Sequence, residues 1–273
     1  MTQGYELYAC PGCRLEFLNP QPDDSTLSSI YGNEYFLGDH TEESSARRSQ
    51  LKRASAKWFL DMLASQAMTP GTALLEIGCG QGELLMEARD RGFQVSGVEL
   101  SAHATAIANQ RLGQNVVQQG SIDSLPLPPE HFGAILAADV IEHVRDPQSF
   151  MFRIRELLSP GGIALLVTPS LDSWSRRVMR RHWMEYKIEH LFYFSPASMR
   201  QLLEQSGFDG IRIFPNRKAM TIDYLWRHFD RYRVALLSPL IGLLRRVVPE
   251  PLAHRHLHVP ASGLVAIARR SSK

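Results

Sequence analysis

Apolar runs alternate with segments of helical spacing from about residue 47 to the C-terminal end of the chain. Seven of these runs are short and bounded by turn residues, which is typical of buried strands. Helical segments separate most of them, and consecutive parallel strands need crossovers of this kind. The pattern predicts an α/β fold with a mostly parallel seven-stranded sheet and helices on both faces. The predicted strands are Ala73–Ile77, Gln94–Val98, Val116–Gln118, Ala134–Ala138, Ile163–Thr168, Gly210–Phe214 and Gly263–Ala268.

Cap and turn residues place the ends of the predicted helices. The first helix has apolar residues at helical spacing and stops at the turn Thr69–Gly71. Serine precedes two later helices as an N-cap, since its side chain accepts a bond from a free backbone N–H. Gly92 and Gly207 each end a predicted helix, because the residue after a helix is often left-handed and glycine favours that conformation. The predicted helices span 47–67, Gly82–Gly92, the residues after Ser101, the residues before Pro160, and Ser195–Gly207.

Two segments lie outside this α/β pattern. Residues 1–45 are rich in turn residues and predict an N-terminal appendage to a domain over 46–273. Residues 219–248 predict a helical insertion near the C-terminal end. Its stretch Val234–Leu244 is apolar but shorter than the roughly 20 residues that cross a membrane. This stretch is either a helix buried in the protein or an amphipathic helix in peripheral contact with a membrane surface.

Charge and composition disfavour some partners. The 30 basic and 28 acidic residues leave a net charge of +2, which is not the basic footprint of a protein that holds DNA or RNA. We therefore expect a small-molecule partner and no nucleic acid, while the sequence leaves the oligomeric state open. The first residues lack the basic and apolar stretches of a secretory signal, so we expect a cytoplasmic protein.

A glycine-rich turn follows the strand Ala73–Ile77. Glycines at positions 78, 80 and 82 allow positive φ angles and let a ligand lie against backbone N–H groups. In the fingerprint of dinucleotide-binding proteins the third glycine would stand at position 83, which is Glu83 here. A carboxylate there would repel a pyrophosphate. The turn therefore predicts a ligand site, but not for a dinucleotide.

The arrangement Glu76-x-Gly78-x-Gly80-x-Gly82 resembles motif I of class I S-adenosylmethionine-dependent methyltransferases. This resemblance implies a Rossmann-like fold and S-adenosylmethionine as the cofactor, which carries no phosphate. Glu99 ends the second strand about 20 residues beyond the first glycine, where an acidic residue can bind a ribose diol. The resemblance continues in order through the turn Leu158–Gly162.

Two further segments complete the predicted cofactor site. Gly120–Pro126 resembles the adenine-facing loop of the family, with the backbone of Ile122 and the side chain of Asp123 as the expected contacts. Ala138–Val144 resembles the segment after the fourth strand. The cofactor-binding residues implied by the resemblance are Glu76, Gly78, Cys79, Gly80, Gly82, Glu99, Leu100, Ile122, Asp123, Ala138 and Asp139.

The segments Tyr8–Pro22 and Glu189–Ser195 are similar to a narrower group of methyltransferases, which includes sugar C-methyltransferases. In that group the N-terminal segment is a zinc knuckle with two C-x-x-C pairs. Here Cys10 and Cys13 form one pair, and His40 is the only other nearby candidate, whereas a structural zinc takes four ligands. We expect a degenerate knuckle without metal, with a complete zinc site as the alternative.

Methyl transfer from a sulfonium needs an oriented acceptor and a base that removes its proton. Such a base belongs beyond the carboxyl ends of the strands. His190 is the preferred candidate, because Glu189 and Tyr186 are close to it and the similar sugar methyltransferases place their acceptor pocket at this segment. His143, after the fourth strand, is the second candidate. The alternative is that either histidine only packs within the protein.

The segment between the fifth strand and the next helix suggests an acceptor. Aromatic walls and guanidinium groups suit a sugar that carries a diphosphate, although the arginines also fit a solvated helix face. We therefore expect methyl transfer to a small molecule, such as a sugar or a nucleotide-linked sugar. The alternatives are a membrane-associated lipid or quinone acceptor and a non-catalytic protein that binds adenosylmethionine. The residues concerned are Trp174, Arg176, Arg177, Arg180, Arg181, Trp183 and Tyr186.

Overall fold

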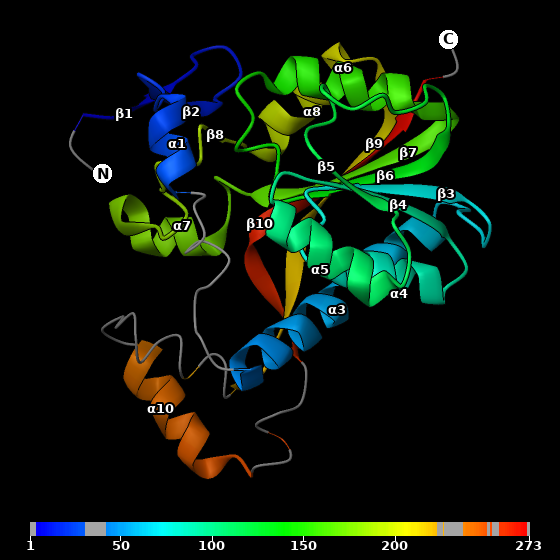
Figure 1. Ribbon diagram of the computed structural model, residues 1–273. Helices are drawn as coiled ribbons and strands as arrows, with labels where there is room; N and C mark the ends of the chain where they lie inside the picture. Colours follow the sequence, from blue (N-terminus) through cyan, green and yellow to red (C-terminus); the bar gives the residue numbers. More distant parts are fainter. Residues whose placement is uncertain are drawn as a thin grey trace.

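A computed structural model gives the fold of the chain. The described residues are 4–30, 42–222, 226, 237–249, 252 and 257–271. The seven central strands are β3 (Ala73–Ile77), β4 (Gln94–Glu99), β5 (Val117–Gln119), β6 (Phe132–Ala138), β7 (Leu158–Pro169), β9 (Phe208–Met220) and β10 (Leu257–Arg270). They form one sheet in the order β5-β4-β3-β6-β7-β10-β9 (Figure 1). The strands from β5 to β7 are parallel and β10 is antiparallel to both its neighbours, which confirms the predicted sheet.

Helices cover both faces of this sheet. The helices are α3 (Glu42–Ala64), α4 (Glu83–Asp90), α5 (Ala102–Leu112), α6 (Pro147–Leu157) and α8 (Pro196–Gln205). Figure 1 shows α3, α4 and α5 on one face and α6 and α8 on the other. Ser101 caps α5 by accepting from the backbone N–H of Ala104, and Ser195 forms a capping box with Ser198 at α8. Both serine caps were predicted from the sequence.

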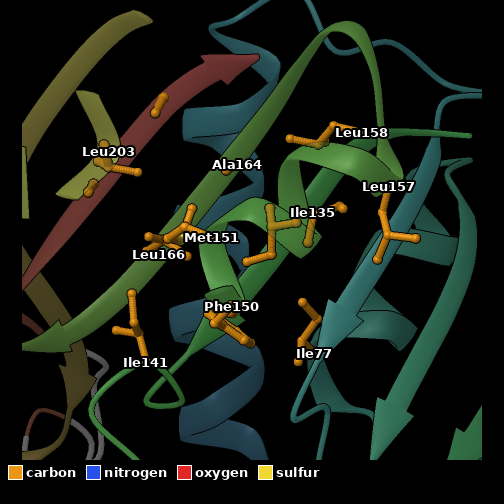
Figure 2. Packing of buried hydrophobic residues seen from close by; sticks show 14 of the residues in the cluster. Ile77, Ile135, Ile141, Phe150, Met151, Leu157, Leu158, Ala164, Leu166 and Leu203 are labelled. Atoms are coloured by element: carbon orange, nitrogen blue, oxygen red, sulfur yellow. The ribbon is translucent and has the colours of Figure 1, made fainter. Parts of the chain in front are cut away.

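Strand side chains alternate between two hydrophobic cores, one on each face of the sheet. In β7, Ala164 and Leu166 belong to the core that contains Phe150 of α6 (Figure 2). Leu165 and Val167 belong to the core that contains residues of α3, α4 and α5. Because both faces are buried, the strands appear in the sequence as nearly continuous apolar runs.

A second, three-stranded sheet joins the N-terminal segment to the segment after β7. The elements around it are β1 (Glu6–Ala9), β2 (Glu16–Asn19), α1 (Asp24–Ile30), α7 (Trp174–Met179), the 3-10 helix η1 (Arg180–His182) and β8 (Phe192–Tyr193). β2 pairs with both β1 and β8, and all pairs are antiparallel. Arg176 donates to the carboxylate of Glu16 across this junction. The division into an appendage over 1–45 and a domain over 46–273 remains a prediction.

The C-terminal region differs in part from its predicted helical insertion. Ala219 and Met220 are not helical: they end β9 and pair with His258 and Leu257 of β10. The helix α10 (Leu237–Val247) agrees with the prediction, whereas the start of the apolar stretch at 234–236 lies outside the described residues. Among the described residues, no helix is long and apolar enough to cross a membrane.

Candidate active site

The turn between β3 and α4 leaves backbone exposed to a ligand. Gly78 and Gly80 have φ angles of 70° and 53°, in the left-handed region that favours glycine. A Cβ atom at Gly78 would lie 2.6 Å from Cγ2 of Val140, so a side chain is excluded there. The predicted Gly82 plays a different part, since a Cβ atom on it would approach Ala108 of α5 at 3.2 Å.

A cavity of about 1080 Å³ opens at the carboxyl ends of β3, β4, β6 and β7. The strand order reverses between β4 and β6 on either side of β3, and ligands of open α/β sheets bind at such a point. Gly82 is absent from the described lining residues. The predicted cofactor residues that line the cavity are Glu76, Gly78, Cys79, Gly80, Glu99, Leu100, Ile122, Asp123, Ala138 and Asp139.

Two backbone N–H groups bind the carboxylate of Glu99 at the end of β4. Its Oε2 accepts from the backbone N–H of Gly80 at 2.8 Å, and its Oε1 accepts from the backbone N–H of Ser101 at 2.9 Å. The residue is buried, with 7% of its surface exposed. Each carboxylate oxygen has two lone-pair sites, so Glu99 keeps acceptor capacity for two vicinal hydroxyl groups. The glycine turn and the carboxylate thus form one rigid unit.

Glu76 is a buried carboxyl group whose Oε2 has no hydrogen-bond partner. Burial raises its pKa well above the ordinary value, and the nearby carboxylates Glu83 and Glu99 raise it further. A buried acceptor without a partner is costly, so it favours a ligand with a cationic donor. The amino group of adenosylmethionine is such a donor, and the residues at this end of the cavity therefore fit the methyl donor.

His143 lines the same cavity beyond β6. Its Nδ1 lies 2.8 Å from the backbone oxygen of Glu189. A carbonyl oxygen only accepts, so Nδ1 carries the proton and Nε2 is the basic nitrogen. Burial lowers the pKa of His143, which keeps the ring neutral near pH 7. Glu189 thus contributes its backbone carbonyl, and not a carboxylate, to this arrangement.

His190 lies against His143 and is not among the described residues that line the cavity. The two rings meet edge to face with centroids 4.7 Å apart. Only 4% of His190 is exposed, and burial, with the neighbouring His143, lowers its pKa to about 2. Tyr186 is also not part of the described lining, and its hydroxyl is bonded to Arg176 and Glu16. The structure therefore brings His143, and not the other predicted base, to the cavity.

Comparison with known proteins gives the family. A family model described as a methyltransferase domain matches residues 46–213. The chain belongs to this family. It is an S-adenosylmethionine-dependent methyltransferase, as predicted from the glycine turn and Glu99.

Relatives and solved structures agree with this assignment. The chain is 26% identical over 175 residues to the ubiquinone biosynthesis O-methyltransferase of Cereibacter sphaeroides, a match that spans 59% of this chain and 69% of the relative. It is 34% identical over 115 residues to the enzyme of the same name from Xanthomonas campestris, over 40% of this chain and about half (48%) of the relative. The fold matches an S-adenosylmethionine-dependent methyltransferase of Archaeoglobus fulgidus with a TM-score of 0.55 and 18% identity, over 90% of this chain and 100% of that chain.

Glu142 is a buried acid that sequence reasoning missed as a site residue. Its Oε2 accepts from the hydroxyl of Thr168 at 3.0 Å, and its Oε1 has no partner. Burial, with the nearby Asp139, raises its pKa well above the ordinary value. Ligand atoms of Glu142, His143 and His190 lie within 4.8 Å of one another, a grouping that would suit a metal ion. Glu142 lies in the segment Ala138–Val144, which resembles the family, but nothing in the sequence assigned this acid a role of its own.

The two cysteines of the N-terminal segment lie far in the sequence from Glu142, His143 and His190. Cys10 and Cys13 are free thiols in the turn between β1 and β2. His40, the third candidate ligand, lies outside the described residues. Within the part of the chain that the structure describes, no grouping suited to a metal ion includes either cysteine. The expectation of a degenerate knuckle stays a prediction.

Sequence reasoning also missed the far wall of the cavity. This wall consists of residues from α1, α3 and the end of β9. The hydroxyl of Ser55 in α3 accepts from the backbone N–H of Ala219 at 3.1 Å and so joins two parts of the wall. The missed lining residues are Asp24, Leu27, Leu51, Lys52, Ser55, Ala56, Phe59, Lys218, Ala219 and Met220.

Proposed function

We propose that the enzyme transfers the methyl group of adenosylmethionine to a hydroxyl oxygen of a small acceptor with a largely apolar ring, as in precursors of quinones. One observation carries this proposal: the glycine turn, Glu99 and His143, whose Nδ1 is bonded to the Glu189 carbonyl, line a single cavity. Both relatives described above are ubiquinone biosynthesis O-methyltransferases, which supports an oxygen acceptor.

At the donor end, Glu99 and Glu76 are the residues that would hold the cofactor. Glu99 is oriented to accept from the ribose hydroxyls, and the unpartnered oxygen of Glu76 is placed for the amino group. Leu100, 71% exposed at the end of β4, and the loop with Ile122 and Asp123 line the region assigned to adenine. When bound, the sulfonium supplies an already activated methyl group, so positioning dominates the chemistry of the protein.

At the acceptor end, His143 takes the proton of the acceptor hydroxyl at Nε2. The Glu189 carbonyl fixes the tautomer, and the packed ring of His190 limits rotation. An apolar wall excludes water around the reacting oxygen and gives the acceptor its contact surface. This wall comprises Leu27, Leu51, Phe59, Val140, Val144 and Met220.

A nucleotide-linked sugar is less well supported as the acceptor. Arg176 is committed to Glu16, Tyr186 and the backbone of Leu171, and Trp183 is buried. These groups are not among the described lining residues of the cavity, and Arg177 is exposed. A non-catalytic donor-binding protein would not need a neutral histidine with a fixed tautomer in the cavity.

The replacement His143→Asn tests the proposal. The amide of Asn can still donate to the Glu189 carbonyl, but it is not a base, so kcat should fall about 10²–10⁴-fold. The affinity for adenosylhomocysteine should stay unchanged. The measurement is transfer of labelled methyl from the donor to a panel of alkylated phenols, hydroquinones and nucleotide sugars. His182→Asn, at an exposed histidine of η1, is the control.

Two results would overturn the proposal. The first is transfer to nucleotide sugars but to no phenolic hydroxyl. The second is a His143→Asn variant that transfers methyl to phenols as fast as the unchanged enzyme.

A further inference from the structure

Lys218 places a cation in the wall of the cavity. It lies in β9, and its Nζ is 3.5 Å from Oδ2 of Asp139. The side chains of Lys218 and Asp139 are 42% and 51% exposed, so the pair is open to whatever enters the cavity. An ion pair this exposed contributes little to folding stability. Its position in a binding cavity therefore points to a ligand.

The backbone of Asp139 fixes this pair. Asp139 has a φ angle of 55°, in the left-handed region that residues with side chains seldom adopt. Its backbone N–H donates to the carbonyl of Val167 in β7 at 2.8 Å, which holds the residue at the end of β6. Uncommon backbone conformations of this kind gather at functional sites.

The charged groups around Lys218 keep its ammonium protonated. Asp139 raises the pKa of Lys218 most, and Glu185 and Glu142 raise it further, which outweighs the lowering by partial loss of solvent around the ammonium. Glu185 is held by the hydroxyl of Ser262, which donates to it at 2.7 Å. The nearby rings of His143 and His190 have lowered pKa values and are neutral near pH 7.

Lys218 differs from the other lysine in the described lining. The Nζ of Lys52 lies 4.0 Å from Oε2 of Glu83, the residue of α4 that directly follows the glycine turn, so Lys52 belongs to the donor end. Lys218 instead lies two residues before Met220, which belongs to the apolar wall. A cation beside apolar surface attracts an anion more strongly than a cation in water does.

We propose that Lys218 binds an anionic oxygen of the acceptor and so selects acidic aromatic hydroxyl compounds as substrates. Asp139 is the internal counter-ion that this anion joins or displaces. The anionic oxygen is either a carboxylate substituent on the ring or the reacting phenolate that forms when His143 takes the hydroxyl proton. This inference rests on the proposed function, since it specifies the acceptor of the same cavity.

Binding to the protein loaded with adenosylhomocysteine tests the inference without any turnover. Calorimetry compares 4-hydroxybenzoate with its neutral counterpart 4-hydroxybenzamide, and compares 4-nitrophenol below and above its own pKa. Lys218→Met should weaken binding of the anion about tenfold and leave the neutral ligand within twofold. Asp139→Asn should strengthen binding of the anion, because the ammonium loses its competitor.

The two ligand pairs separate the two sources of the anion. A preference for 4-hydroxybenzoate over the amide identifies a carboxylate, and a preference for ionised 4-nitrophenol alone identifies a phenolate. Lys57→Met, in α3 and outside the described lining, is the control and should change neither. If Lys218→Met alters the binding of no anion, the inference is wrong even where methyl transfer to neutral phenols stands. If anions bind through Lys218 but no phenol is methylated, the anion site stands, whereas the proposed function and the assignment of this site to the acceptor both fail.

Discussion

His190 is a titratable residue held neutral in the protein interior. Its pKa in the folded state is about 2, whereas an exposed histidine in the unfolded chain titrates near 6.5. Below that value the unfolded chain binds a proton that the folded protein does not bind. Stability from this group is therefore present above about pH 6.5 and is lost as the pH falls. We infer that His190 supports the ring of His143 and that, in return, the folded protein is less stable at acidic pH.

The replacement His190→Gln should remove this acid sensitivity. In the unchanged protein, His190 lowers the free energy of unfolding by about 1.4 kcal/mol for each pH unit below about 6. Urea denaturation between pH 5 and pH 8 should therefore show a smaller slope with pH for the variant. His182→Gln, at an exposed position, should keep the original slope. Equal slopes for all three proteins would show that His190 titrates normally in the folded state.

At the level of elements, the turn between β3 and α4 combines two constraints. Its glycines take positive φ angles, and at Gly78 there is also no space for a side chain beside Val140. The sequence predicted this turn because glycine spacing is a local signal. The predicted caps Ser101 and Ser195 are local in the same sense, since each acts on a backbone N–H three residues away.

The replacement Gly78→Ala separates these constraints. Its new Cβ atom lies 2.6 Å from the Val140 side chain, so the turn must move and adenosylhomocysteine should bind at least tenfold more weakly. Gly113→Ala is the matched control, since Gly113 has a φ angle of 66° with no atom within 4 Å. The control should lose only about 1–2 kcal/mol of stability from backbone strain. Calorimetry and thermal denaturation measure the two effects, and unchanged affinity in Gly78→Ala would contradict the assigned role of the turn.

Elements that depend on tertiary contacts escaped prediction. β9 was predicted to end at Phe214, because the apolar run stops there, yet pairing with β10 carries the strand to Met220. Lys218 therefore fell between the predicted strand Gly210–Phe214 and the predicted helical insertion over 219–248. The sequence favoured His190 as the base, but His143 lines the cavity and His190 packs against it. The sequence around each histidine does not show which of the two faces the cavity.

At the scale of the whole molecule, the order of strands creates the site. The strand order reverses between β3 and β6, so the chain leaves these neighbouring strands toward helices on opposite faces, α4 and α6, and the cavity lies at their carboxyl ends (Figure 1). The alternation of apolar runs and helical segments in the sequence predicted the seven-stranded sheet. The wall contributed by α3 and β9 could not be predicted, because no local pattern shows which helix covers the open end of a sheet.

Isothermal titration calorimetry with adenosylhomocysteine and with NAD tests whether the cavity at β3 and β4 is built for an adenosyl sulfonium donor. The protein should bind adenosylhomocysteine in the micromolar range, Glu99→Ala should bind it at least tenfold more weakly, and NAD should give no heat. Micromolar binding of NAD without binding of adenosylhomocysteine would contradict it.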